Sequence, residues 1–181
     1  MPPFSIRAGR ASDAAALAEF AARTFRDAFA AGNRPEDLAL HLSRSYCTHQ
    51  QQRELEDPDI STLLAESADG LVGYAQLRRG PAPGCVIGES PVELMRFYVA
   101  REWQGRGLAR RLMQAVDEEA ARIGARTLWL GVWEVNERAK AFYRKCGFAD
   151  VGSHIFVVGT DPQTDRLMAR VVPPESSQSR T

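Results

Sequence analysis

The stretch FYVAREWQGRGLARRLMQAVDEEAARIG, residues 97–124, joins an apolar run to a helix-like pattern through two glycines, Gly105 and Gly107, on either side of Arg106. Glycine leaves the backbone uncovered, so successive N–H groups can converge into a concave nest. A helix that follows adds its free N–H groups and the positive end of its dipole. The segment Gln104–Ala109 is therefore predicted to bind an anion, and a phosphate is its natural occupant.

The glycines alone do not identify the ligand. A Walker loop, GxxxxGK[ST], is absent from the sequence. A dinucleotide fingerprint needs a third glycine where Arg110 stands, and an acidic residue about 20 positions further on. A simple tight turn before a helix is an equally good interpretation of the glycines by themselves. The neighbouring segments have to decide between these interpretations.

The sequence around this stretch predicts alternating helices and strands. A strand is expected at residues 4–7, followed by a helix capped by Ser12 or Asp13 and running to about residue 30. Further helices are expected at 35–46, 48–56, 108–123 and from Asn136 to Cys146. Further strands are expected at 60–67, 71–79, 91–99, 127–132, 148–159 and 165–172. This order indicates one mixed α/β domain over residues 1–172, followed by a polar tail, 173–181, that is expected to be disordered.

The composition limits the class of protein. Apolar residues make up 44% of the 181 residues, which favours a packed core. Lys and Arg together equal Asp and Glu at 23 each, so a partner that is a nucleic acid is not expected. No apolar run reaches the roughly 20 residues that cross a bilayer, and no signal peptide is evident, so no membrane partner is expected.

The cysteines and histidines give no support to a metal site. The three cysteines are far apart and never in a CxxC spacing, which fits a reducing cytoplasm, and the three histidines form no ligand pair. Cys146 is expected at a helix C-terminus, where the dipole raises a thiol pKa, so a packing role is favoured. His154 has two open roles, in an acceptor pocket or as a bridge between strands.

The order of the central blocks resembles a known family. A strand ending RFYV is followed by QGRGLA and a helix, then by LWLGV and NERAKAFYRKCGF. This arrangement, over roughly residues 60–172, resembles the GNAT superfamily of acetyl-CoA-dependent N-acetyltransferases. Its Q/R-x-x-G-x-G/A and N-x-x-A-x-x-x-Y motifs are met here by Gln104, Gly107 and Ala109, and by Asn136, Ala139 and Tyr143. The segments LWLGVWEVNERAKAFYRKCGF, GSHIF, QTDRLM and TFRDAFAAGNRPEDL look most like the PaiA-type spermidine/spermine N-acetyltransferase branch.

The resemblance implies an α+β fold, in which helices flank a twisted, mostly antiparallel sheet with one splayed strand pair. It places the pantetheine arm of acetyl-CoA along Phe97, Tyr98 and Val99, and the thioester near Asn136 and Tyr143. The pyrophosphate would lie on Gln104, Gly105, Arg106, Gly107, Leu108 and Ala109. The acetyl group would pass directly to a primary amine in a ternary complex, with no metal, and the enzyme could be a homodimer.

Two proton transfers need side chains. An alkyl ammonium with a pKa of about 10.4 is only about 0.04% neutral at pH 7, so a base is useful. Glu93 is the first candidate, directly or through water, although it could equally form a surface cross-strand pair. Glu134 is the second candidate, although it could equally be a solvated loop acid. Tyr143 can protonate the departing thiolate, while its alternative role is core packing, and Asn136 is expected to position cofactor or water and cap its helix.

The acceptor is left open between classes. The branch likeness favours a polyamine, whose second ammonium could meet acids such as Glu36, Asp37, Glu89, Glu93 or Glu134. The rival acceptor is a protein N-terminus or lysine. A non-catalytic acetyl-CoA sensor is a third interpretation, which the presence of both Asn136 and Tyr143 disfavours.

Overall fold

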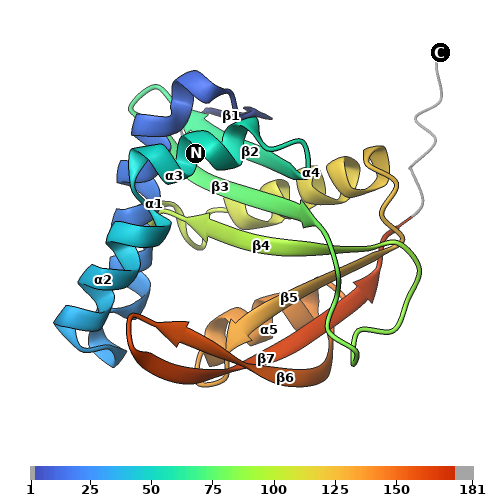
Figure 1. The fold of residues 1–181 in the computed structure, drawn as a ribbon. Helices are drawn as coiled ribbons and strands as arrows, with labels where there is room; N and C mark the ends of the chain where they lie inside the picture. The colour runs from blue at the N-terminus through green and yellow to red at the C-terminus, as the bar shows by residue number, and fades with distance from the viewer. Residues whose placement is uncertain (1–2, 174–181) are drawn as a thin grey trace, which may run out of the picture.

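The computed structural model describes residues 3–173, so the polar tail expected at 173–181 lies outside the described residues except for Pro173. A seven-stranded sheet in the order β1-β2-β3-β4-β5-β7-β6 organises the chain (Figure 1). Its strands are β1 (Phe4–Ala8), β2 (Ile60–Ser67), β3 (Gly70–Arg79), β4 (Pro91–Val99), β5 (Thr127–Trp133), β6 (Ala149–Val158) and β7 (Asp161–Val171). Neighbouring strands are antiparallel except for β4 and β5, so the expected mostly antiparallel α+β fold is confirmed.

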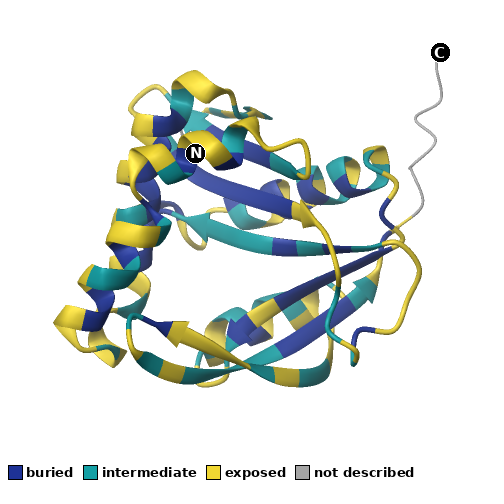
Figure 2. Ribbon diagram, viewed as in Figure 1, coloured by how far each residue is buried: buried dark blue, intermediate teal, exposed yellow. Residues whose placement is uncertain are grey.

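Helices cover both faces of the sheet. They are α1 (Ala14–Phe29), α2 (Pro35–Ser45), α3 (Thr48–Glu56), α4 (Leu108–Arg122) and α5 (Glu137–Lys145), with short 3-10 turns η1 (Ala11–Asp13), η2 (Ala30–Gly32) and η3 (Arg101–Trp103). One apolar cluster joins the sheet to α4 and α5, and another joins it to α1 and α2. Figure 2 shows the result, with β3 and β5 largely buried and β6 largely exposed. Within residues 3–173, no helix is long and apolar enough to cross a membrane.

Most expected elements are confirmed, and two details are corrected. Asp13 lies before α1, but it does not cap that helix through its side chain. Its carboxylate instead accepts the Arg10 N–H at 2.8 Å and pairs with Arg7 at 2.7 Å, because Asp13 is the last residue of η1 and its side chain closes that turn. The last strand begins at Asp161 rather than at Asp165, because residues 161–164 already pair with β6.

The parallel pair β4 and β5 separates after a short contact. Only Pro91–Glu93 of β4 pair with Thr127–Trp129 of β5. A bulge at Met95 then interrupts the β3–β4 ladder, and bulges bend and twist a strand locally. Beyond it β4 keeps its pairing with β3 through Val99, so its other edge is left without a strand partner. Figure 1 shows the two strands diverging from their shared end, as the expectation of a splayed pair requires.

The β6–β7 hairpin reaches across to the N-terminal helices. The turn residue Thr160 donates its N–H and its hydroxyl to Asp37 Oδ1 on α2, at 2.6 and 2.7 Å. On β7, Gln163 Nε2 donates to Asn33 Oδ1 at 2.6 Å. Gly159 has φ +65°, and a Cβ there would lie 2.4 Å from the Asp37 backbone. The N-terminal helices and the β6–β7 hairpin therefore meet opposite the gap between β4 and β5.

Candidate active site

A cavity of about 1120 Å³ opens where β4 and β5 separate. Its walls come from β4, the end of β5, the start of α5, helices α1 and α2, and the β6–β7 hairpin. Small-molecule sites are commonly about 300–1,000 Å³, so this cavity is large enough for more than one substrate. Its position follows from the splay, because a fully paired sheet would leave no space there.

The open edge of β4 forms one wall of the cavity. Phe97, Tyr98 and Val99 all line it, and on their other edge they pair with β3. The ring of Phe97 stacks on Phe142, with centroids 5.6 Å apart, and the ring of Tyr98 stacks on Tyr74 at the same distance. These contacts hold the side chains, and the backbone of the free edge has no strand partner, so its N–H and C=O groups can pair with an extended ligand, apart from the Val99 carbonyl that Gln104 occupies.

The glycine loop continues directly from this wall. Gly105 and Gly107 have φ of +75° and +84°, and Gly107 immediately precedes α4. Gln104 Nε2 donates to Val99 O at 3.1 Å, which ties the loop to the end of β4. A Cβ on either glycine would meet nothing within 4 Å, so open space lies in front of this backbone. The geometry suits a diphosphate, because the first N–H groups of α4 have no partners within the helix.

Two residues of the second motif lie across the gap, and both line the cavity. Asn136 Oδ1 accepts the Ala139 N–H at 3.1 Å, so the expected helix cap is confirmed. Tyr143 packs edge-on against Phe97 and Phe148, at centroid distances of 6.3 and 5.7 Å. Burial raises the pKa of the Tyr143 phenol above its ordinary value, so its hydroxyl stays protonated at neutral pH, as a proton donor must.

The two candidate bases differ in position. Glu93 lines the cavity, but its Oε2 accepts hydrogen bonds from Arg78 Nε at 2.9 Å and Arg78 Nη2 at 2.6 Å. The two residues are directly opposite in the β3–β4 ladder, so this is the cross-strand pair that the sequence left as its alternative. Glu134 is exposed after β5, and it is not among the described residues that line the cavity.

Sequence reasoning did not single out Asp165, an acid that lines the cavity. Asp165 on β7 has a side chain only 13% exposed, and His154 Nε2 on β6 lies 3.9 Å from its Oδ2. Desolvation raises the pKa of Asp165 to about 6. His154 acts in the opposite direction and lowers this pKa, whereas Glu134 raises it further. The sequence does contain a signal for it. Asp165, Leu167 and Ala169 are every second residue of one strand, so the acid shares a face with two apolar residues.

The acids considered for a polyamine are not gathered at the cavity. Glu36 and Glu89 are exposed. The carboxylate of Asp37 already accepts a hydrogen bond from Thr160 and forms a salt bridge with Arg34. With Glu134 also outside, Glu93 is the one of the five that lines the cavity. Acid spacing in the sequence could not show this, because these residues lie on different elements.

Two other residues considered from the sequence have clear positions. Cys146 is half-buried beside α5, and burial raises the pKa of its thiol, which fits the packing role expected for it. Trp133 lines the cavity, and its ring lies 6.0 Å from that of Phe29. Within residues 3–173, no three His, Cys, Asp or Glu side chains are grouped so as to hold a metal ion.

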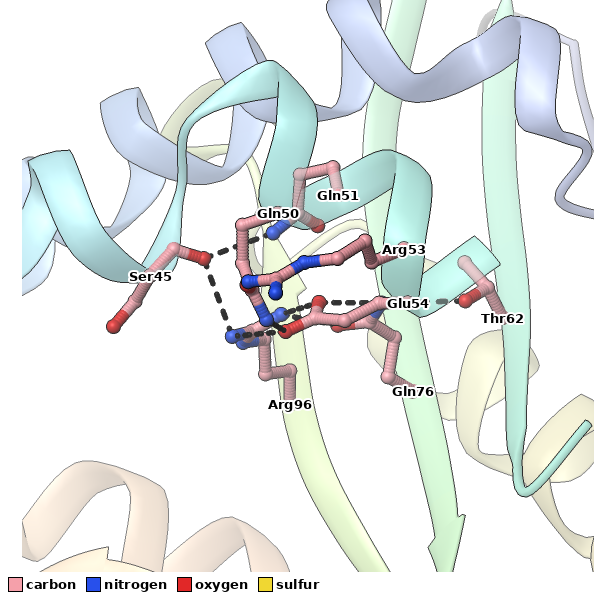
Figure 3. Close-up of polar contacts among 8 residues, drawn as sticks. All are labelled: Ser45, Gln50, Gln51, Arg53, Glu54, Thr62, Gln76 and Arg96. Atoms are coloured by element: carbon pink, nitrogen blue, oxygen red, sulfur yellow. Dashed lines mark hydrogen bonds and ion pairs between the residues drawn. The ribbon is translucent and has the colours of Figure 1, made fainter. Parts of the chain in front are cut away.

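A buried ion pair supports the end of the cavity near α3. Figure 3 shows Glu54 of α3 and Arg96 of β4 pointing toward one another. Arg96 Nη2 donates to Glu54 Oε1 at 3.1 Å, and Nη1 donates to Glu54 and, at 2.7 Å, to Gln76 Oε1. The guanidinium also lies 4.7 Å from the centroid of the Tyr46 ring. Since their side chains are only 8% and 11% exposed, Glu54 and Arg96 depend on each other.

Replacing Glu54 with glutamine should destabilise the fold. The change leaves the Arg96 guanidinium buried without a counterion, and breaking a buried pair in this way costs about 3–5 kcal/mol. The free energy of unfolding, measured in urea, should fall by that amount. Glu56→Gln at the exposed end of the same helix is the control and should change it by less than about 0.5 kcal/mol. Equal stability of the two variants would show that the pair does not hold α3 to the sheet.

Comparison with known proteins agrees with this geometry. Residues 17–148 match the acetyltransferase (GNAT) family. An uncharacterized N-acetyltransferase from the pepI 3′ region of Lactobacillus delbrueckii subsp. lactis is 33% identical over 159 residues, 86% of this chain and 92% of that protein. The aminoglycoside N(6′)-acetyltransferase type 1 of Stenotrophomonas maltophilia is 30% identical over 148 residues, 81% of this chain and 86% of that protein.

A solved structure has the same fold. The PaiA N-acetyltransferase of Thermoplasma acidophilum, crystallised in complex with coenzyme A, superposes with a TM-score of 0.74 at 20% identity. The match covers 93% of this chain and 99% of that protein. At this identity the likeness shows the fold alone, so it does not establish the PaiA-type branch.

Proposed function

Because this chain belongs to the acetyltransferase (GNAT) family, we propose that it is an acetyl-CoA-dependent N-acetyltransferase of a small primary amine bound between β4 and β5. The observation that carries the proposal is the continuity of two surfaces. The free backbone edge of Phe97–Val99 leads directly into the glycine nest at the start of α4. An extended arm that ends in a diphosphate, as in coenzyme A, fits such a surface.

The other half of the cavity supports a small acceptor. It is closed by α1, α2 and the β6–β7 hairpin, and the rings of Phe25, Phe29, His41, Trp133 and Phe156 line it. His41 stacks on Phe25 with ring centroids 4.7 Å apart, and it lies 5.7 Å from Phe156. An enclosed aromatic wall favours an amine with an apolar body and can also attract its ammonium group. A flexible segment of a protein is less suited to this aromatic wall as an acceptor.

The comparisons support the same class of acceptor without naming one. The relative from Stenotrophomonas maltophilia is an aminoglycoside acetyltransferase, which acts on a small molecule. The case for a polyamine as the acceptor rests on the PaiA-type likeness. The acids expected to receive its second ammonium lie mostly outside the cavity. A polyamine therefore belongs in the test as one acceptor among several.

A thiol-release screen with acetyl-CoA tests the proposal. The acceptors are spermidine, spermine, an aminoglycoside, an arylalkylamine and short peptides with free N-termini, with products identified by mass spectrometry. We expect release of coenzyme A together with acetylation of at least one small amine. Turnover with the peptides alone would assign a protein acceptor. Binding of acetyl-CoA without transfer to any amine would indicate the sensor interpretation.

Glu93→Gln separates the two roles of Glu93. Its cross-strand pair with Arg78 is partly exposed, and such pairs contribute about 0.2–1 kcal/mol to stability, so the free energy of unfolding should fall by less than about 1 kcal/mol and kcat/KM should change little. Any loss of kcat/KM should be uniform with pH and should be shared by Arg78→Gln, which breaks the same pair. A far larger loss at pH 7 that disappears as the pH approaches the pKa of the amine would instead support Glu93 as the base.

A further inference from the structure

The cavity is lined by an acid that no motif identified, Asp165, and His154 lies beside it. Asp165 and His154 are directly opposite on β7 and β6, and both face Gly131 of β5. A Cβ at Gly131 would lie 3.2 Å from Asp165 Oδ2 and 3.2 Å from His154 Nε2. The missing side chain at this position therefore leaves the two polar atoms facing uncovered backbone, which itself lines the cavity.

The pair lies close to the expected site of transfer. Pairing between β4 and β5 ends at Trp129, so Gly131 is two residues into the diverging part of β5. Asn136 and Tyr143, which follow β5 on the chain, line the same cavity as Asp165 and Gly131. An amine beside Gly131 would thus lie between the acid on β7 and the residues expected at the thioester.

His154 lies behind Asp165, outside the described residues that line the cavity. Its Nε2 is buried and has no hydrogen-bond partner among the described residues. A ligand in the cavity therefore meets the carboxylate of Asp165 and not this nitrogen. An ammonium group has three N–H donors, and the carboxylate can accept one of them.

We propose that Asp165 is the general base of the acetyl transfer. The proposal rests on the function proposed above. The ammonium of the acceptor donates one N–H to Asp165 Oδ2. Asp165 then takes the proton, and the freed electron pair of the nitrogen attacks the carbonyl carbon of the thioester.

The protons and bonds balance. The acceptor brings three N–H protons, and the amide product keeps one of them. One proton goes to Asp165 and from there to solvent, and the other ends on the sulfur of coenzyme A, through Tyr143. The C–N bond forms, the C–S bond breaks, and no oxidant, reductant or further reactant is required.

The environment of Asp165 suits this task. Because desolvation raises its pKa to about 6, the carboxylate is ionised at pH 7, yet it is a stronger base than an ordinary aspartate. His154 on β6 and Glu134 after β5 act on it most directly. The other ionisable side chains of the surrounding walls include Asp27 on α1, His41 and Arg44 on α2, Glu93 on β4 and Arg138 on α5. Glu93 is already paired with Arg78.

Asp165→Asn tests the proposal, with an amine that the wild type acetylates as the probe. At pH 7, kcat/KM should fall about 10²–10⁴-fold, the usual effect of losing a positioned base. The deficit should shrink as the pH rises toward the pKa of the amine, because free amine then no longer needs the base. The wild-type profile should rise through about pH 6 and the variant's should not. Acetyl-CoA affinity, measured by calorimetry, should not change.

Control variants distinguish a base from a structural residue. Asp150→Asn, on the exposed face of β6, should leave the rate and the pH profile unchanged. His154→Gln should keep the rise and move it to higher pH, because His154 lowers the pKa of Asp165. Methoxyamine, which is neutral at pH 7, should react equally well with wild type and Asp165→Asn. The Asp165→Asn variant should fold. Because the pKa of Asp165 is raised, its charged form lowers the stability of the protein above about pH 6, and asparagine removes that charge.

The outcomes separate this proposal from the function on which it rests. An unchanged kcat/KM in Asp165→Asn, or a loss that is equal at every pH and for methoxyamine, would overturn the assignment of the base while the acetyltransferase function stands. If the wild type binds acetyl-CoA and acetylates no primary amine in the screen, both proposals fail together.

Discussion

Replacing Gly107 with glutamate is expected to abolish acetyl-CoA binding. The residue has φ +84° and open space where a side chain would project, directly at the N-terminus of α4. A carboxylate there would occupy the anion site and satisfy the N–H groups and the helix dipole that we propose for the pyrophosphate. It would also repel that group. Calorimetric titration with acetyl-CoA should therefore show no binding where the wild type binds.

Gly107→Gln is the matched control, because it carries the same backbone strain and nearly the same volume without the charge. Strain at a positive φ costs about 1–2 kcal/mol in either variant. The glutamine variant should retain measurable binding, and the difference between the two variants reports the charge. Arg106→Ala should weaken binding only modestly, since the Arg106 side chain is exposed. Wild-type affinity in Gly107→Glu would remove the pyrophosphate from this loop.

Replacing Tyr143 with phenylalanine is expected to lower kcat by about 10²–10⁴-fold, the usual effect of a positioned proton donor. Phenylalanine keeps the ring that packs against Phe97 and Phe148, so folding and acetyl-CoA binding should be preserved. The loss should appear in kcat, because the hydrogen bond strengthens only as sulfur becomes charged. Steady-state kinetics with one amine and acetyl-CoA measure it.

Two comparisons identify the source of that loss. With the amine held fixed, an acyl donor whose thiol has a lower pKa needs less help from an acid, so the deficit should shrink. Tyr74→Phe is the control, since Tyr74 is a buried tyrosine outside the residues that line the cavity. It should leave kcat unchanged. If kcat is also unchanged in Tyr143→Phe, the residue only packs, and the thiolate takes its proton from another source.

The burial of Tyr143 bears on this mechanism. The raised pKa of the phenol makes it a weaker acid than the unperturbed value of about 10 suggests. Proton transfer is still reasonable, because the same desolvation makes a thiolate leaving into the cavity a stronger base. The sequence identified the residue through its spacing from Asn136, but only the packing of Phe97, Phe142 and Phe148 around it shows this second effect.

The sequence by itself determined the elements and the residues that we propose for the cofactor half of the site. Helical and alternating periodicity located the strands and helices, because periodicity reflects which face of each element is buried. The motif from Gln104 to Ala109 and the cap at Asn136 could be read directly because each is local. Positive φ at a glycine and a cap on a helix depend on residues only a few positions apart.

The tertiary structure decided the acceptor half of the site. Asp165, His154 and Gly131 come from three strands, and they meet only because β7 lies between β5 and β6 in the sheet. The pairing of Glu93 with Arg78 likewise depends on the register of β3 against β4. Burial and charge partners depend on through-space distance, which a linear pattern does not contain. The sequence could therefore identify the segments that we propose for the acetyl donor, while the proposed base on the acceptor side required the folded chain.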